Sequence, residues 1–148
     1  MGLKIKIENA VKDAMRSRDA ETLSVLRMFL AAVKNREIEK RAKGGEMSED
    51  DVMAVLKSEV KKRRDAITEF QKGGRQELAD KEAREMMILE KYLPAEISDE
   101  EIEKLLQPLV AGASVSDFGR VMSAAMKAVA GRASGDRVSA MVRRLLSA

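Results

Sequence analysis

One stretch decides the fold: SEDDVMAVLKSEVKKRRDAITEFQK, residues 48–72. Its apolar residues recur three and four positions apart, which is the period of an α-helix with one buried face. Ser48 can accept a hydrogen bond from the N–H of Asp51 while the Asp51 carboxylate accepts one in return, so this pair predicts the helix start. Gly73-Gly74 predicts its end. We therefore expect a long amphipathic helix over this stretch. Its apolar face consists of Val52, Leu56, Val60, Ile67 and Phe70.

The helical period continues on both sides of this stretch, and no segment alternates strictly between polar and apolar residues. Pro94 is expected to terminate the fourth helix, and Pro108 to shorten the fifth, because proline lacks the N–H that a helix interior needs. The sequence thus predicts an all-α protein, with a four-helix domain over residues 1–93 and a three-helix module over 94–148. The expected helices cover about 3–17, 19–40, 48–72, 75–93, 98 up to Pro108, 117–130 and a last one that includes 138–146.

The composition excludes several classes of function. The 148 residues include no His and no Cys, so a thiol nucleophile, a disulfide framework and the usual neutral-pH general base are absent. Aromatic residues make up 3% of the chain, so stacking on bases is not a main binding mode. No apolar run approaches the roughly 20 residues of a membrane span. We expect a cytoplasmic, monomeric protein with no catalytic residues, no cofactor, no metal site and no membrane association.

One charged residue lies on a face that should be buried. Arg63 falls near the centre of the apolar face of residues 48–72, and Glu82 near the centre of the next helix's apolar face. A hairpin about Gly73-Gly74 places Arg63 opposite Glu82 or Glu85. Because a buried charge is costly unless it is paired, this arrangement predicts a structural ion pair that fixes the hairpin. The alternative is a polar groove between the hairpins.

The end of the chain is basic, since residues 104–148 carry seven Lys or Arg and two Asp or Glu. Within it, the turn at 131–135 precedes the last helix, whose free N–H groups and dipole attract phosphate. The simpler interpretation is a tight turn capped by Ser134 or Asp136, and the residues alone favour it. The basic side chains that phosphate could contact here are Arg120, Lys127, Arg132 and Arg137.

A second basic feature is a ridge along the helix over 48–72, formed by Lys57, Lys61, Arg64 and Lys72. Such a ridge is usually a solvated face, and the alternative is a surface that contacts phosphate. The chain contains no P-loop, no EF-hand spacing and no dinucleotide-binding fingerprint. The residues therefore identify no catalytic centre.

Several stretches resemble the YqeY-like family of small bacterial proteins. This family is related to the tail domain of the GatB component of the glutamine-dependent tRNA amidotransferase, and the shared module is the GatB/YqeY domain. The resemblance extends over essentially the whole chain. The stretches that carry it are residues 26–28, 35–40, 55–66, the Tyr-Leu-Pro junction at 92–94, 117–122 and 131–135.

The resemblance implies an all-α protein whose last three helices correspond to the amidotransferase tail, which is associated with tRNA binding. The amidating and glutaminase sites of that enzyme lie outside this region, so it implies no amide transfer by this chain alone. Two departures weaken the carried-over RNA contact. Ser134 stands where the family usually has Asp, and Ala130 stands near a usual Lys.

We therefore hypothesise a non-catalytic tRNA-binding accessory protein, with Arg120, Lys127, Arg132 and Arg137 as phosphate contacts. The first alternative is a helical adaptor for an amidotransferase or synthetase subunit. The second is a component of a carbon–nitrogen ligase activity that uses glutamine as amide donor, which the absence of His and Cys disfavours.

Overall fold

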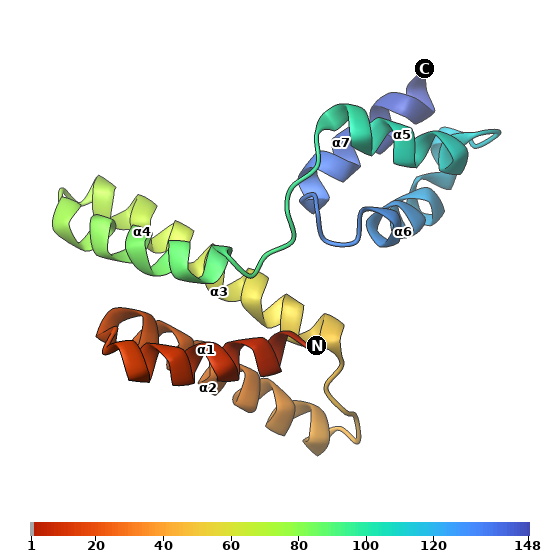
Figure 1. The fold of residues 1–148 in the computed structure, drawn as a ribbon. Coiled ribbons are helices and arrows are strands. Elements are labelled where there is room, and N and C mark those ends of the chain that lie inside the picture. Colours follow the sequence, from red (N-terminus) through yellow and green to blue (C-terminus); the bar gives the residue numbers. More distant parts are fainter. Residues whose placement is uncertain (1) are drawn as a thin grey trace. The chain divides into compact units, whose positions relative to one another are not determined.

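The computed structural model describes residues 2–148, which form seven α-helices and one 3₁₀ helix (Figure 1). No residue in that range belongs to a strand, which confirms the all-α prediction. No helix in it is long and apolar enough to cross a membrane. The elements are α1 (Leu3–Ser17), α2 (Ala20–Ala42), α3 (Glu49–Lys72), α4 (Gln76–Glu90), α5 (Asp99–Val110), η1 (Val115–Asp117), α6 (Phe118–Val129) and α7 (Gly135–Ser147).

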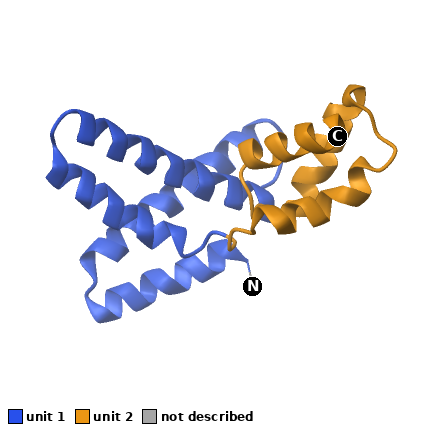
Figure 2. Ribbon diagram, turned by 90° about the horizontal axis from the view of Figure 1, so that it is seen from above, with its two compact units in different colours: residues 1–93 blue, residues 94–148 orange. Residues whose placement is uncertain are grey.

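The chain divides between Leu93 and Pro94 into two compact units, which Figure 2 colours separately. In the first unit, α1 and α2 form one antiparallel hairpin and α3 and α4 form a second. Helix α2 also packs on α3 and α4, so the two hairpins bury a common core. Its buried residues are Leu3, Ile7, Val25, Leu26, Phe29, Val33, Val52, Leu56, Val60 and Leu89.

The second unit has its own core, in which α5, α6 and α7 pack against one another. The 3₁₀ helix η1 packs on α6 and α7. The apolar face of α7 supplies four of the buried residues, in agreement with the helical spacing of its sequence. The buried residues of this unit are Ile102, Leu106, Val121, Ala125, Val129, Ala133, Val138, Met141, Val142 and Leu146.

The helix start predicted at Ser48 is confirmed. Ser48 Oγ accepts a hydrogen bond from the N–H of Asp51 at 3.2 Å, and Asp51 Oδ2 accepts one from the N–H of Ser48 at 2.9 Å. Two of the four free N–H groups at this helix end therefore have partners. Ser134 caps α7 through one hydrogen bond, which its Oγ accepts from the N–H of Arg137 at 3.2 Å.

The expectation that Pro108 ends the fifth helix early is wrong, because α5 continues through Pro108 to Val110. Proline inside a helix removes one hydrogen bond and crowds the carbonyl oxygen four residues earlier, and α5 ends two residues after Pro108. Ile102 and Leu106 are fully buried and hold the helix against the core of the second unit. Tertiary packing therefore outweighs the local preference of the proline.

Candidate functional site

The structure brings Arg63 together with both glutamates considered for it. Arg63 lies on α3 with 9% of its side chain exposed. Its Nη1 donates to Glu82 Oε2 at 3.2 Å and also to the Glu85 carboxylate, both on α4. Nη2 lies 4.0 Å from Met28 Sδ on α2, and Nε is buried without a hydrogen-bond partner in residues 2–148. One guanidinium thus joins three helices of the first unit.

Arg132, one of the four expected phosphate contacts, binds the end of its own helix. Its Nε donates to the Val129 carbonyl oxygen at 2.9 Å, and its Nη2 donates to that of Ala128 at 3.2 Å. The last carbonyl groups of a helix have no partner within the helix, and a cationic side chain there also complements the helix dipole. The Arg132 side chain therefore caps α6.

Arg137 connects the start of α7 to the segment before α5. Its Nη2 donates to the Ile97 carbonyl oxygen at 2.9 Å and to Asp99 Oδ1 at 2.8 Å. Its Nη1 lies 3.9 Å from Glu96 Oε2, and 34% of the side chain is exposed. Two carboxylates already balance this guanidinium, so its attraction for a phosphate is reduced.

Arg120 and Lys127 are the more accessible of the four residues. Both lie on α6, seven positions apart, so they share one face of the helix. The Arg120 side chain is 67% exposed, and its Nη2 lies 3.7 Å from Asp117 Oδ1. The pKa of Asp117 is lowered chiefly by the hydrogen bond from the Ser114 N–H, and Arg120 adds to the effect. Lys127 is exposed and has no ion pair or hydrogen bond of its side chain within residues 2–148.

The second unit as a whole is electrically neutral. Residues 94–148 carry seven Lys or Arg and seven Asp or Glu, because the acidic first turn of α5 belongs to the same unit as the basic helices. Some of these charges pair directly, as Arg144 Nη2 does with Glu103 Oε2 at 3.2 Å. Arg143 lies over the ring of Phe118, 5.2 Å from its centroid. The unit therefore lacks the strong positive field typical of nucleic-acid-binding domains.

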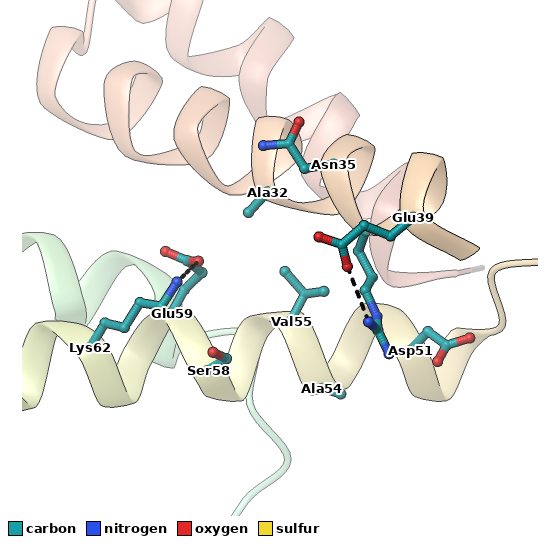
Figure 3. Close-up of a pocket in the computed structure, with 10 residues that line it drawn as sticks. Ala32, Asn35, Glu39, Asp51, Ala54, Val55, Ser58, Glu59 and Lys62 are labelled. Atoms are coloured by element: carbon teal, nitrogen blue, oxygen red, sulfur yellow. Dashed lines mark hydrogen bonds and ion pairs between the residues drawn. The ribbon is translucent and has the colours of Figure 1, made fainter. Parts of the chain in front are cut away.

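A polar groove lies between α2 and α3, in the first unit (Figure 3). It encloses about 530 Å³. Figure 3 shows the small side chains of Ala32 on α2 and Val55 on α3 facing each other across it. Arg63 is not among the residues that line it. The lining consists of Ala32, Asn35, Arg36, Glu39, Asp51, Ala54, Val55, Ser58, Glu59 and Lys62.

Two contacts fix how α2 and α3 face each other. Lys40 Nζ lies 2.5 Å from Asp51 Oδ2, and Met28 Sδ lies 4.0 Å from Arg63 Nη2. The residue numbers of each pair add to 91, so the helices are antiparallel and positions with that sum lie opposite each other. Asp51 also accepts hydrogen bonds from Ser48. These bonds, that of Lys40 above all, hold the pKa of Asp51 well below its ordinary value.

The position of this groove is not evident from the sequence. The polar groove expected as an alternative between the hairpins would contain Arg63, whereas the groove lies on another face of α3. The available signal was the pair of small residues Ala32 and Ala54, beside Ser58, on helices that are otherwise charged on their outer faces. Small side chains at a helix contact leave a space between the helices only if the helices do not move closer together and no neighbouring side chain fills the space. The sequence therefore could not decide between a groove and a closer packing.

Comparison with known proteins finds relatives among fungi. A protein of unknown role from Schizosaccharomyces pombe is 33% identical over 97 residues, which are 66% of this chain and 76% of that protein. "Altered inheritance of mitochondria protein 41, mitochondrial" of Clavispora lusitaniae is 33% identical over 122 residues, 80% of this chain and 69% of that protein. Its namesake in Vanderwaltozyma polyspora is 30% identical over 110 residues, 70% of this chain and 58% of that protein.

These relatives correct the expectation of a cytoplasmic protein, because those whose names state a location are mitochondrial. They are also fungal, whereas the resemblance pointed to small bacterial proteins. The expectation rested on the lack of an apolar signal or membrane segment. Mitochondrial transit segments are amphipathic and rich in Arg and Ser, so a lack of apolar segments does not argue against that compartment.

A family match covers nearly the whole chain. The family described as "Yqey-like protein" matches residues 4–146, which span all seven helices and both compact units. The match includes the α2–α3 groove, the Arg63 ion pair and the basic residues of α6. The chain belongs to the YqeY-like family.

Proposed function

We propose that this chain is a non-catalytic accessory protein whose α6 contacts tRNA. Arg120 and Lys127 carry the proposal, because they are exposed, share one helix face and lie two helical turns apart. Two turns correspond to about 10.5 Å. Cationic side chains on one exposed face can contact the phosphates of an RNA backbone without reading its sequence.

Arg132 and Arg137 contribute less to this proposal than the sequence suggested, because their guanidinium groups bind carbonyl and carboxylate oxygens of the second unit. With two phosphate contacts, log affinity should fall with log salt concentration at a slope of about −1.4 for single-stranded and about −1.8 for duplex regions. Binding is therefore expected to be weak, salt-sensitive and tolerant of sequence.

The test is a titration of the full chain with labelled tRNA over a salt series. Arg120→Gln together with Lys127→Gln should abolish most of the salt dependence, since it removes both contacts. Lys104→Gln together with Arg144→Gln removes the same charge from α5 and α7 and should leave the slope unchanged. Equal affinity and slope for the first double variant and the unaltered chain would refute the α6 contact.

We also propose that residues 1–93 and 94–148 act as separate domains, the second corresponding to the amidotransferase tail. Support comes from the two compact units and their separate buried cores. The division lets the second unit contact RNA while the first is available for another partner.

A protein adaptor is the second candidate function, and the α2–α3 groove favours it. A groove of about 530 Å³ has the size of a ligand-binding site, yet its lining is largely polar and it lies open on the helix surface. An amidotransferase or synthetase subunit is the partner that the family resemblance suggests. In a pull-down with such a subunit after nuclease treatment, Arg36→Gln with Lys62→Gln should reduce recovery, whereas the α6 variant should not.

A further inference from the structure

The Arg63 guanidinium has hydrogen-bond donors that the two glutamates of α4 leave unused. Its bonds to Glu82 and Glu85 both come from Nη1. Nε is buried without a hydrogen-bond partner in residues 2–148, and the side chain as a whole is 9% exposed. Nη2 lies 4.0 Å from Met28 Sδ and has no oxygen partner in the same range. Because a buried donor without a good acceptor costs free energy, an oxygen atom beside Met28 would stabilise this group.

Met28 can supply that oxygen atom through its own chemistry. The residue lies on α2 and is 57% exposed, so small solutes in water reach it. A thioether sulfur is a weak hydrogen-bond acceptor, whereas oxidation to the sulfoxide adds a polar oxygen one bond length from the sulfur. Since the sulfur is 4.0 Å from Nη2, an oxygen one bond nearer comes within hydrogen-bond distance. Oxidation of Met28 therefore provides the acceptor that Arg63 lacks.

Two other methionine sulfurs contact an arginine in residues 2–148, and neither contact has the same properties. Met15 Sδ lies 3.8 Å from Arg27 Nη2, but both residues are exposed, so water competes for the guanidinium. Met141 Sδ lies 3.0 Å from Arg144 Nη2, but Met141 is 9% exposed and is shielded from an oxidant. In the described part of the chain, Met28 is thus the exposed methionine that contacts a buried guanidinium.

We propose that Met28 is a site of reversible oxidation by peroxide, at which the sulfoxide oxygen accepts a hydrogen bond from Arg63 and strengthens the contact of α2 with α3. With hydrogen peroxide, the sulfur attacks one peroxide oxygen, so an S–O bond forms and the O–O bond breaks. The sulfur loses two electrons, and the other peroxide oxygen takes up the remaining proton and leaves as water. Methionine sulfoxide reductases reverse the change.

The expected effect is the opposite of the usual one. Methionine oxidation commonly disrupts apolar packing, because it makes an apolar side chain polar. Met28 is exposed and loses little packing, while the buried Arg63 gains an acceptor. Oxidation at this position should therefore stabilise the first unit. The proposal depends neither on RNA binding by α6 nor on an adaptor function.

The first test replaces Met28 with glutamine, whose amide oxygen lies one bond from the atom that takes the place of the sulfur. Hydrogen exchange of the α3 amides should be about tenfold slower in Met28→Gln than in Met28→Leu, because glutamine provides a hydrogen bond to a charged group. Met87 on α4 is the matched control, since it is 62% exposed and its sulfur has no hydrogen bond within residues 2–148. Met87→Gln and Met87→Leu should exchange at equal rates.

The second test follows the oxidation itself in the full chain treated with hydrogen peroxide. Peptide mass spectrometry measures the sulfoxide at each methionine, and nuclear magnetic resonance follows the side-chain N–H signals of Arg63. These signals should shift as the Met28 sulfoxide forms and return after treatment with methionine sulfoxide reductases. The same peroxide treatment of Met28→Leu should leave them in place.

Three results would overturn the proposal. The first is equal hydrogen exchange in Met28→Gln and Met28→Leu. The second is a set of Arg63 signals that does not move although mass spectrometry shows the Met28 sulfoxide. The third is the absence of sulfoxide at Met28 under conditions that oxidise Met87.

Discussion

Replacement of Arg63 by methionine tests the ion pair of the first unit. The substitution keeps most of the side-chain volume on α3 and removes the positive charge. It leaves Glu82 and Glu85 on α4 without the guanidinium that binds both of them. Lys81 Nζ, 3.9 Å from Glu85 Oε1, is the remaining cation beside them. The variant therefore creates two partly buried carboxylates with little compensation.

The structure sets the magnitude of this effect. Removing one partner of a buried ion pair costs about 3–5 kcal/mol. The Glu82 and Glu85 side chains are 25% and 15% exposed, so water solvates them in part after the substitution. The Nε of Arg63, buried without a partner, is removed as well, which offsets some of the loss. We therefore expect the free energy of unfolding of the first unit to fall by about 2–4 kcal/mol.

Urea denaturation followed by circular dichroism, with hydrogen exchange of α3 and α4, measures this change and separates the first unit from the second. Arg64→Met is the matched control, because Arg64 is 63% exposed and lies 3.8 Å from Glu90, and it should change stability by less than about 0.5 kcal/mol. Adding Glu82→Gln and Glu85→Gln to Arg63→Met should restore part of the loss. A change for Arg63→Met as small as that of the control would refute the reasoning.

Two further predictions concern links between helices. Asp51→Asn removes the charge that binds Lys40. Because the pKa of Asp51 is lowered in the folded chain, the ionised carboxylate stabilises the fold above about pH 4, and this stabilisation is lost as the pH falls further. The free energy of unfolding should therefore fall less steeply with pH below about pH 4 in Asp51→Asn than in the unaltered chain. Asp50→Asn is the control, and identical slopes for Asp51→Asn and the unaltered chain would contradict this prediction. Arg137→Ala should lower the stability of the second unit by about 1–2 kcal/mol, because it breaks the hydrogen bonds to Asp99 and to the Ile97 carbonyl oxygen. Hydrogen exchange of α7 measures this change, and unchanged exchange would show that these two hydrogen bonds contribute nothing to stability.

Local sequence signals predict most of the fold. The apolar period of residues 48–72 and the Ser48–Asp51 capping box are short-range patterns, and the helix begins and ends as they indicate. Pro108 shows the limit of such signals, because its effect on α5 depends on the burial of Ile102 and Leu106, which belongs to the packed unit. Local chemistry therefore indicates the elements, and tertiary packing corrects their ends.

The candidate site is less predictable, because a charged side chain can serve several partners. From sequence, Arg132 and Arg137 look like free cations beside a glycine-containing turn. In the structure Arg132 binds the carbonyl groups at the end of α6, and Arg137 binds Ile97 and Asp99. Those partners depend on how three helices meet, which spacing along the chain does not specify. The α2–α3 groove depends in the same way on a distance between helices.

The charge of the second unit shows why the choice of boundary matters for function. Counted from residue 104 the end of the chain is strongly basic, but counted from the start of the compact unit it is neutral. The acidic side chains before and within α5 compensate several arginines directly, as Asp99 and Glu103 do for Arg137 and Arg144.

In this unit, Lys104 and Lys127 are the basic side chains without an ion pair, hydrogen bond or ring contact. Any binding of phosphate must therefore depend on few groups, so it must be weak on its own. If the proposed RNA contact exists, a second contact made by the same complex would strengthen it, because the first contact raises the effective concentration of the second.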